Sequence, residues 1–129
     1  MIAREEGSGT RSAFEDLVMG GESEISPKSI VQNSNGSVRQ LVSDDVNAIG
    51  FISLGLVNDR VVALSLDGVA ATRENVVNGT YSLFRPFLYV CKGKPVGVAK
   101  EFIDFTLSPE GQQVLEREGL IPIEGESVR

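Results

Sequence analysis

The sequence predicts an α/β layered fold with at least some parallel strand pairing. Its 129 residues are enough to bury a core without disulfides or a structural metal. Hydrophobic residues make up 41% of the chain and charged residues 23%, which is typical of a globular protein rather than a disordered one. Apolar runs of strand length alternate with segments whose apolar residues recur at helical spacing, and this alternation favours packed layers of strands and helices.

The first quarter of the chain predicts a strand, a glycine turn and a helix. Residues 1–3 are apolar, and apolar side chains recur at helical spacing from Phe14 to the Gly20-Gly21 pair, where the helix ends. Ser8 and Ser12 are both candidate N-caps. The helix is therefore expected to begin between these two serines.

The next part of the chain predicts three strands and one short helix. A strand is expected over 29–32, followed by a helix with an apolar stripe from Val38 that ends near 43–45. Two dense apolar runs of strand length then cover 48–54 and 61–66. Both runs could be buried on two faces, as in the interior of a parallel sheet.

The segment from Thr72 to Gly79 predicts a two-turn helix, because a capping residue stands at its front and a glycine at its back. Tyr81–Cys91 predicts a long strand, which Pro86 confines to an edge, an end or a crossover. Cys91 ends this apolar run and is expected to be a small buried side chain.

The last third of the chain predicts two consecutive helices. The first carries apolar residues from Val98 to Leu107. Ser108 as N-cap and Pro109 at the first helical position then start a second helix, which runs to Glu118. The polar tail over 124–129 is expected to fray.

Composition excludes several classes of function. A net charge of −6 and a pI near 4.6 argue against a nucleic-acid partner. The absence of histidine and the single cysteine remove His-based triads and Cys/His zinc sites, so we predict no metal or cofactor. The chain has no apolar run of membrane-spanning length and no basic-then-apolar start, so neither a membrane span nor a signal peptide is predicted in it.

The strongest functional signal is Gly7-Ser8-Gly9-Thr10, between the first strand and the first helix. Glycines let the backbone approach a ligand closely, and the free N–H groups and dipole of a helix N-terminus favour an anion. The hydroxyl groups of Ser8 and Thr10 add donors, and Arg4 adds a guanidinium suited to a tetrahedral oxyanion. This pattern predicts an anion cradle, although Ser and Gly also cap helices that bind nothing.

Glu5 and Glu6 are unexpected in an anion site because both are negatively charged. A carboxylate becomes useful if the anion carries a proton that it can donate, as phosphate does near neutral pH and sulfate does not. The alternative is that one or both side chains face solvent, and for Glu5 this is the interpretation we prefer.

The whole segment, Arg4-Glu5-Glu6-Gly7-Ser8-Gly9-Thr10 followed by Phe14, resembles the phosphate-binding segment of the substrate-binding proteins of high-affinity phosphate ABC transporters. The pattern of that family is Arg-x-acidic-Gly-Ser-Gly-Thr. The similarity covers nearly the whole chain, with further matches at Asn35-Gly36-Ser37-Val38, 47–55, Asn78-Gly79-Thr80-Tyr81, Arg85-Pro86 and 102–112.

This resemblance implies a periplasmic-binding-protein-like (type II) lobe, an α/β structure with a mixed sheet flanked by helices. It implies that Arg4, Ser8, Gly9 and Thr10 contact inorganic phosphate. It also implies that Glu6 is the carboxylate that accepts the proton of phosphate, at a position where Asp is frequent in the family.

Family members are about twice as long, so the resemblance implies that residues 1–80 form the second lobe of such a protein. Residues 81–129 would then form the return crossover and the C-terminal helices that normally pack on the first lobe. The implied function is non-enzymatic solute binding that feeds the permease subunits of an ABC transporter, at a periplasmic or extracellular, membrane-associated location in the full-length protein. The alternative is a truncated chain that self-associates through its uncovered apolar surface and has little phosphate affinity.

Overall fold

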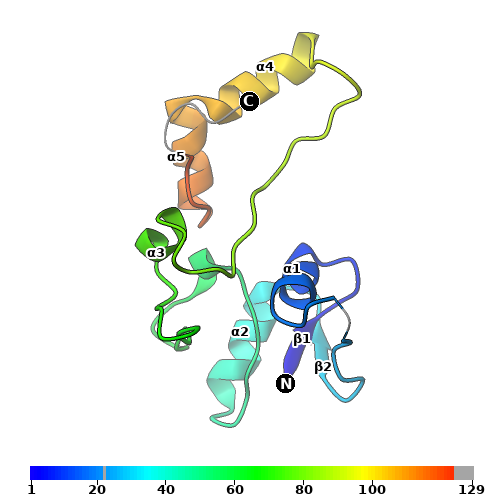
Figure 1. Ribbon diagram of the computed structural model, residues 1–129, viewed down its shortest axis with the longest axis vertical. Coiled ribbons are helices and arrows are strands. Elements are labelled where there is room, and N and C mark those ends of the chain that lie inside the picture. The colour runs from blue at the N-terminus through cyan, green and yellow to red at the C-terminus, as the bar shows by residue number, and fades with distance from the viewer. Residues whose placement is uncertain (22, 124–129) are drawn as a thin grey trace. The chain divides into compact units, whose positions relative to one another are not determined.

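A computed structural model describes residues 1–21 and 23–123 of the chain. It divides into two compact units, Met1–Arg85 and Pro86–Arg129, each of which is described by itself (Figure 1). The predicted polar tail over 124–129 lies outside the described residues. Among the described residues, no helix combines the length and apolar character that crossing a bilayer would need.

The first unit is built on a small parallel sheet. Strand β1 (Ile2–Arg4) pairs in parallel with β2 (Ile30–Gln32), as the sequence predicts. On its other edge, Ile2 forms an isolated parallel bridge with Gly50. The centre of the sheet is therefore β1, and the carboxyl ends of three chain segments meet at one edge.

Helices α1 (Gly9–Leu17) and α2 (Asn35–Asp44) both pack against β1 (Figure 1). The unit also contains the 3₁₀ helix η1 (Leu54–Leu56) and the short helix α3 (Arg73–Val77), which Thr72 caps as predicted. The buried apolar side chains of this unit are Ile2, Ala3, Ile25, Val38 and Tyr81. These elements confirm the α/β class.

Close packing between Gly50 and α2 fixes the third segment of the sheet. A Cβ atom at position 50 would lie 2.8 Å from Cγ1 of Val38 and 3.1 Å from the carbonyl oxygen of Ile2. Val38 is only 1% exposed, so it cannot move away into solvent. Next to Gly50, the ring of Phe51 stacks on Phe14 of α1 with centroids 4.4 Å apart.

Three predicted strands are wrong. The run over 48–54 contributes one bridge residue, 61–66 ends in an isolated bridge between Leu66 and Val69, and 81–91 forms no strand. A strand exists only where a neighbouring strand can accept and donate its backbone hydrogen bonds, and the described residues offer these runs no such ladder. Several of their apolar side chains are exposed, and Val90 is 92% exposed.

The second unit contains two consecutive helices, α4 (Gly97–Leu107) and α5 (Pro109–Arg117), with Ser108 between them. Both helices confirm the sequence prediction, including Ser108 as the N-cap of α5 and Pro109 at its first position. Before α4, Tyr89 contacts Phe102 edge-to-face with ring centroids 6.0 Å apart. The prediction for Cys91 is wrong, because its thiol is exposed on a segment that no strand or helix of the described residues covers.

Candidate functional site

The predicted cradle forms a strand, a tight turn and a helix. After β1, Gly7 adopts a φ of 81°, in the left-handed region that favours glycine, and the chain reverses into α1. Ser8 is the N-cap of α1, and its Oγ accepts a hydrogen bond from the backbone N–H of Arg11 at 3.3 Å. The helix therefore begins at the earlier of the two predicted serines. Ser12 lies inside the first turn, where its hydroxyl donates to the carbonyl of Ser8.

The N-terminal end of α1 has unused donors. The backbone N–H groups of Gly9 and Thr10, and the hydroxyl of Thr10, have no hydrogen-bond partner in the part of the chain that the structure describes. Ser8 is only 5% exposed and uses its Oγ as an acceptor, which leaves its hydroxyl hydrogen available. The helix dipole places a partial positive charge at the same point.

Arg4 ends β1 with its guanidinium held in a fixed orientation. Its Nε and Nη2 donate to the two carboxylate oxygens of Glu5 at 2.8 and 2.9 Å, and its Nη1 donates to Oδ1 of Asn35 at 2.8 Å. The Arg4 side chain is only 11% exposed. Since a guanidinium has five N–H donors, these three bonds leave one donor on each of its terminal nitrogens.

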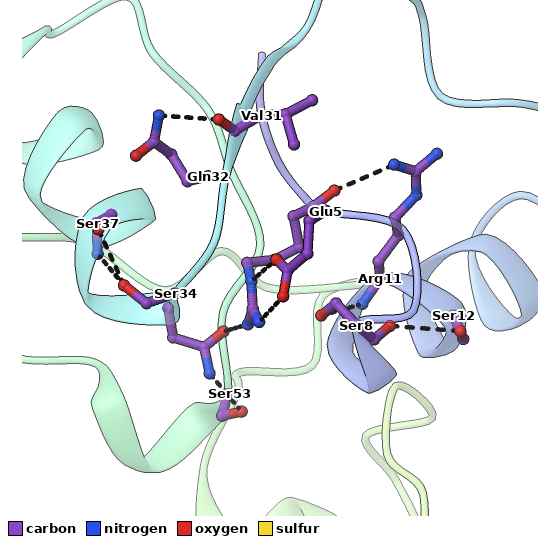
Figure 2. A network of polar contacts seen from close by, with 11 residues as sticks. Glu5, Ser8, Arg11, Ser12, Val31, Gln32, Ser34, Ser37 and Ser53 are labelled. Atoms are coloured by element: carbon purple, nitrogen blue, oxygen red, sulfur yellow. Dashed lines mark hydrogen bonds and ion pairs between the residues drawn. The ribbon is translucent and has the colours of Figure 1, made fainter.

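Asn35 connects the cradle to the rest of the sheet edge. It is the first residue of α2, and its Nδ2 donates to Oγ of Ser53 at 3.3 Å, beyond the Gly50 bridge. In Figure 2 the dashed contacts of this network run from Ser53 at one end to Glu5 at the other. The carboxyl ends of neighbouring parallel segments meet at one edge, which is the usual place for a ligand in an open α/β sheet.

Arg11 locks the helix to the strand. Its Nη1 donates to the carbonyl oxygen of Arg4 at 3.1 Å, and its Nε donates to Oε1 of Glu15 at 2.8 Å. Figure 2 shows the Arg11 side chain reaching from α1 to the end of β1. Because these contacts engage Arg11 with the protein itself, its role is to hold the turn in shape.

The two glutamates occupy different environments. Glu5 keeps the solvent exposure that the sequence predicts, since its side chain is 39% exposed, and its carboxylate also forms the bidentate ion pair with Arg4. The hydrogen bond from Arg4 lowers the pKa of Glu5 below its usual value of 4.5. Glu6 is exposed, and its carboxylate has no partner among the described residues. Glu5 therefore orients the arginine, while the Glu6 carboxylate is exposed and not engaged by the described residues.

A polar hollow of about 680 Å³ lies beside the cradle in the same unit, lined by Glu6, Gly7, Arg11 and Ser12 among others. Its further lining includes Glu15, Asp16 and Glu24, so its charge does not suit an anion. Arg4, Ser8 and Thr10 do not line it. Within residues 1–21 and 23–123, no group of three or more acidic or cysteine side chains is placed to hold a metal ion.

Sequence reasoning found the contiguous part of the site, and it missed the side chains that support it from a distance. The missed residues are Asn35, Ser53 and Arg11, which hold Arg4 or the turn. Asn35 could have been suspected, because it follows a strand parallel to β1 and starts a helix at the same sheet edge.

Residues 1–110 match the family model of the PBP superfamily domain. The chain belongs to the PBP superfamily. Within this superfamily it is 42% identical over 134 residues to the phosphate-binding protein PstS 2 of Streptococcus agalactiae, with 96% of this chain and 45% of the relative covered. The resemblance stated from the sequence, and the fold class it implies, are thereby confirmed.

Two solved structures are similar to this chain. A phosphate-binding protein of a phosphate ABC transporter from Streptococcus pneumoniae superposes with a TM-score of 0.83 at 38% identity, over 98% of this chain and 52% of that one. A Clostridium perfringens protein assigned to phosphate ABC transport was solved with bound phosphate. It superposes with a TM-score of 0.82 at 44% identity, over 95% of this chain and 51% of that one. The chain thus spans about half the length of its relatives.

Proposed function

We propose that this chain is the phosphate-cradle lobe, with the following C-terminal helices, of a solute-binding protein of a phosphate ABC transporter. The observation that carries the proposal is the open N-terminus of α1, preceded in the same turn by an oriented arginine with unused donors. The names of the relatives, which are phosphate-binding proteins, support inorganic phosphate as the anion.

In this proposal Arg4, Ser8, Gly9 and Thr10 donate hydrogen bonds to phosphate oxygens. The backbone N–H groups of Gly9 and Thr10 and the two hydroxyls converge at the positive end of the helix dipole. Arg4 offers its two remaining N–H groups as a planar fork. The Glu5 and Asn35 contacts preorganise that fork, which lowers the entropic cost of binding.

Glu6 accepts the proton of hydrogen phosphate. Its exposed carboxylate follows the arginine in the turn and is not engaged by any described residue. Sulfate has no proton to donate near neutral pH, so the same carboxylate repels it. The site is proposed to bind and release its anion without covalent chemistry and without a cofactor.

The wider setting of the whole protein is part of the same proposal. Residues 1–80 form its second lobe, and 81–129 form the return crossover and the helices that pack on the first lobe. Its partners are the permease subunits, at a periplasmic or extracellular, membrane-associated location. Since a two-lobed clamp desolvates its ligand better than an open half-site, the chain by itself should bind phosphate weakly.

A second candidate function is self-association through the uncovered apolar surface. The observation that favours it is the exposure of large apolar side chains in the second unit, among them Phe87, Leu88, Val90, Val96 and Val98. Monomeric proteins rarely expose contiguous apolar patches of large area. Light scattering over a concentration series separates the two candidates: a mass that rises toward a dimer supports self-association, and a constant monomer mass contradicts it.

The test of phosphate binding is a ¹H–¹⁵N NMR titration of the chain. Phosphate should shift the amide signals of Gly9 and Thr10 in a saturable manner, and sulfate at equal ionic strength should not. Arg4→Ala should abolish the shifts, whereas Arg60→Ala, which removes an exposed arginine paired with Asp44, should preserve them. The absence of shifts in the wild type at tens of millimolar phosphate would overturn the proposal.

A further inference from the structure

A second guanidinium lies against the N-terminus of α1. A Cβ atom at position 9 would overlap Nη2 of Arg85, and it would lie 3.1 Å from Cζ and 3.6 Å from Nη1 of the same side chain. Both residues belong to the first unit, Met1–Arg85. Glycine at position 9 is therefore what makes room for the arginine.

The position of Arg85 is electrostatically unfavourable as it stands. The first turn of α1 contains no acidic residue, and the helix dipole adds a partial positive charge there. Among the described residues, no carboxylate or carbonyl oxygen accepts a hydrogen bond from Arg85. The other arginine of the site, Arg4, is paired with the carboxylate of Glu5. An anion at this point would be attracted both by the Arg85 guanidinium and by the free N–H donors of the helix.

We propose that Arg85 is a further ligand of the anion in the cradle, an inference that rests on the proposed phosphate site. Its guanidinium closes over Gly9 and donates to a phosphate oxygen. Arg4, the other arginine of the site, donates from the strand before the turn. The anion thereby neutralises the Arg85 guanidinium and the helix dipole together, whereas the charge of Arg4 is already paired with Glu5.

The chain around Arg85 suits this role. Pro86 follows it and restricts the backbone of Arg85 to extended conformations, which limits the directions its side chain can take. The side chain itself is exposed, so it can move aside to admit the anion and return over it. Gly9 thus has two roles: its free N–H is a donor for the anion, and its missing side chain leaves space for the Arg85 guanidinium.

The experiment compares phosphate affinity in wild type, Arg85→Ala, Arg85→Lys and the control Arg60→Ala, from the amide shifts of Gly9 and Thr10. Arg85→Ala should weaken phosphate binding about tenfold, the usual effect of losing one charge-assisted hydrogen bond. Arg85→Lys should recover part of the loss, because it keeps the charge without the fork. Arg60→Ala should bind as the wild type does.

A direct readout is the side-chain Nε–H NMR signal of Arg85, assigned by its absence in Arg85→Lys. Phosphate should shift this signal with the same saturation curve as the Gly9 amide. If wild type binds phosphate while Arg85→Ala binds within twofold of it and the Nε–H signal stays in place, the Arg85 inference is overturned and the phosphate site stands. If wild type binds no phosphate, both proposals fall together.

Discussion

The N-terminal ends of α1 and α5 use the same cap for different purposes. Ser8 accepts a hydrogen bond from the N–H of Arg11 at 3.3 Å, and Ser108 accepts one from the N–H of Gly111 at 3.2 Å. In each case the serine stands three residues before the donor. Judged from the cap alone, the two helix ends are equivalent.

The residues that precede each helix make the two N-terminal ends different. At α5 the preceding helix closes the end: a Cβ atom at Gly111 would lie 2.7 Å from Cα of Thr106 and 2.8 Å from the carbonyl carbon of Phe105. Pro109 has no N–H to offer, and Glu110 adds an acid to the first turn. At α1 the preceding turn leads away, and the described residues leave two N–H groups without a partner. An open end, rather than a serine cap, marks the candidate anion site.

The largest expected effect comes from adding one methyl group at the closed end. Gly111→Ala should destabilise the chain by about 3 kcal/mol, because the Cβ meets backbone atoms of α4 that cannot move independently. Urea unfolding followed by circular dichroism measures this change. A loss below about 0.5 kcal/mol would mean that α4 and α5 are not in close contact at Gly111.

A glycine-to-alanine substitution at the open end should behave differently. In Gly9→Ala the new Cβ meets only the far end of the flexible Arg85 side chain, so the free energy of unfolding should change by less than about 1 kcal/mol. Phosphate affinity should nevertheless fall, since Arg85 is displaced. A large stability loss with unchanged affinity would reverse the roles assigned to the two helix ends.

Removing the caps should give intermediate effects. Ser8→Ala and Ser108→Ala should each lower the free energy of unfolding by about 1 kcal/mol, the usual contribution of a serine N-cap. Only Ser8→Ala should also weaken phosphate binding in the NMR titration. Equal phosphate affinity in the two variants would show that the Ser8 hydroxyl does not reach the ligand.

The sequence predicted the local parts of this comparison and missed the non-local ones. Both serine caps, Pro109 and the strand before α1 follow from residues within a few positions of one another. The ion pair of Arg4 with Glu5 is equally local, but sequence cannot choose between pairing and solvation for adjacent charges.

The strands predicted over 61–66 and 81–91 failed for a related reason. Their residues have the composition of strands, but a strand also needs a neighbouring strand to pair with. Whether such a neighbour is present depends on the whole fold and not on the local sequence. Asn35 and the proposed ligand Arg85 were missed because their proximity to the turn depends on chain folding across many positions. Local chemistry is predictable from one sequence, whereas partners distant in the chain are not.

The smallest expected effect is a pH dependence that belongs to the open end alone. The pKa of Glu5 is lowered by its hydrogen bond with Arg4, so the folded state favours the charged carboxylate. A lowered pKa stabilises the fold at pH values above 4.5, and that contribution is lost as the pH falls through the folded-state pKa.

Glu5→Gln should therefore reduce stability relative to wild type near neutral pH, and the difference should shrink as urea titrations move below pH 4.5. Glu110→Gln, at the start of α5, serves as the control that removes a carboxylate from the closed end. A difference between wild type and Glu5→Gln that stays constant with pH would mean that the pair does not hold Arg4. In that case the Glu5 carboxylate would not preorganise the Arg4 guanidinium. The distinction between the two helix ends would then have no electrostatic basis.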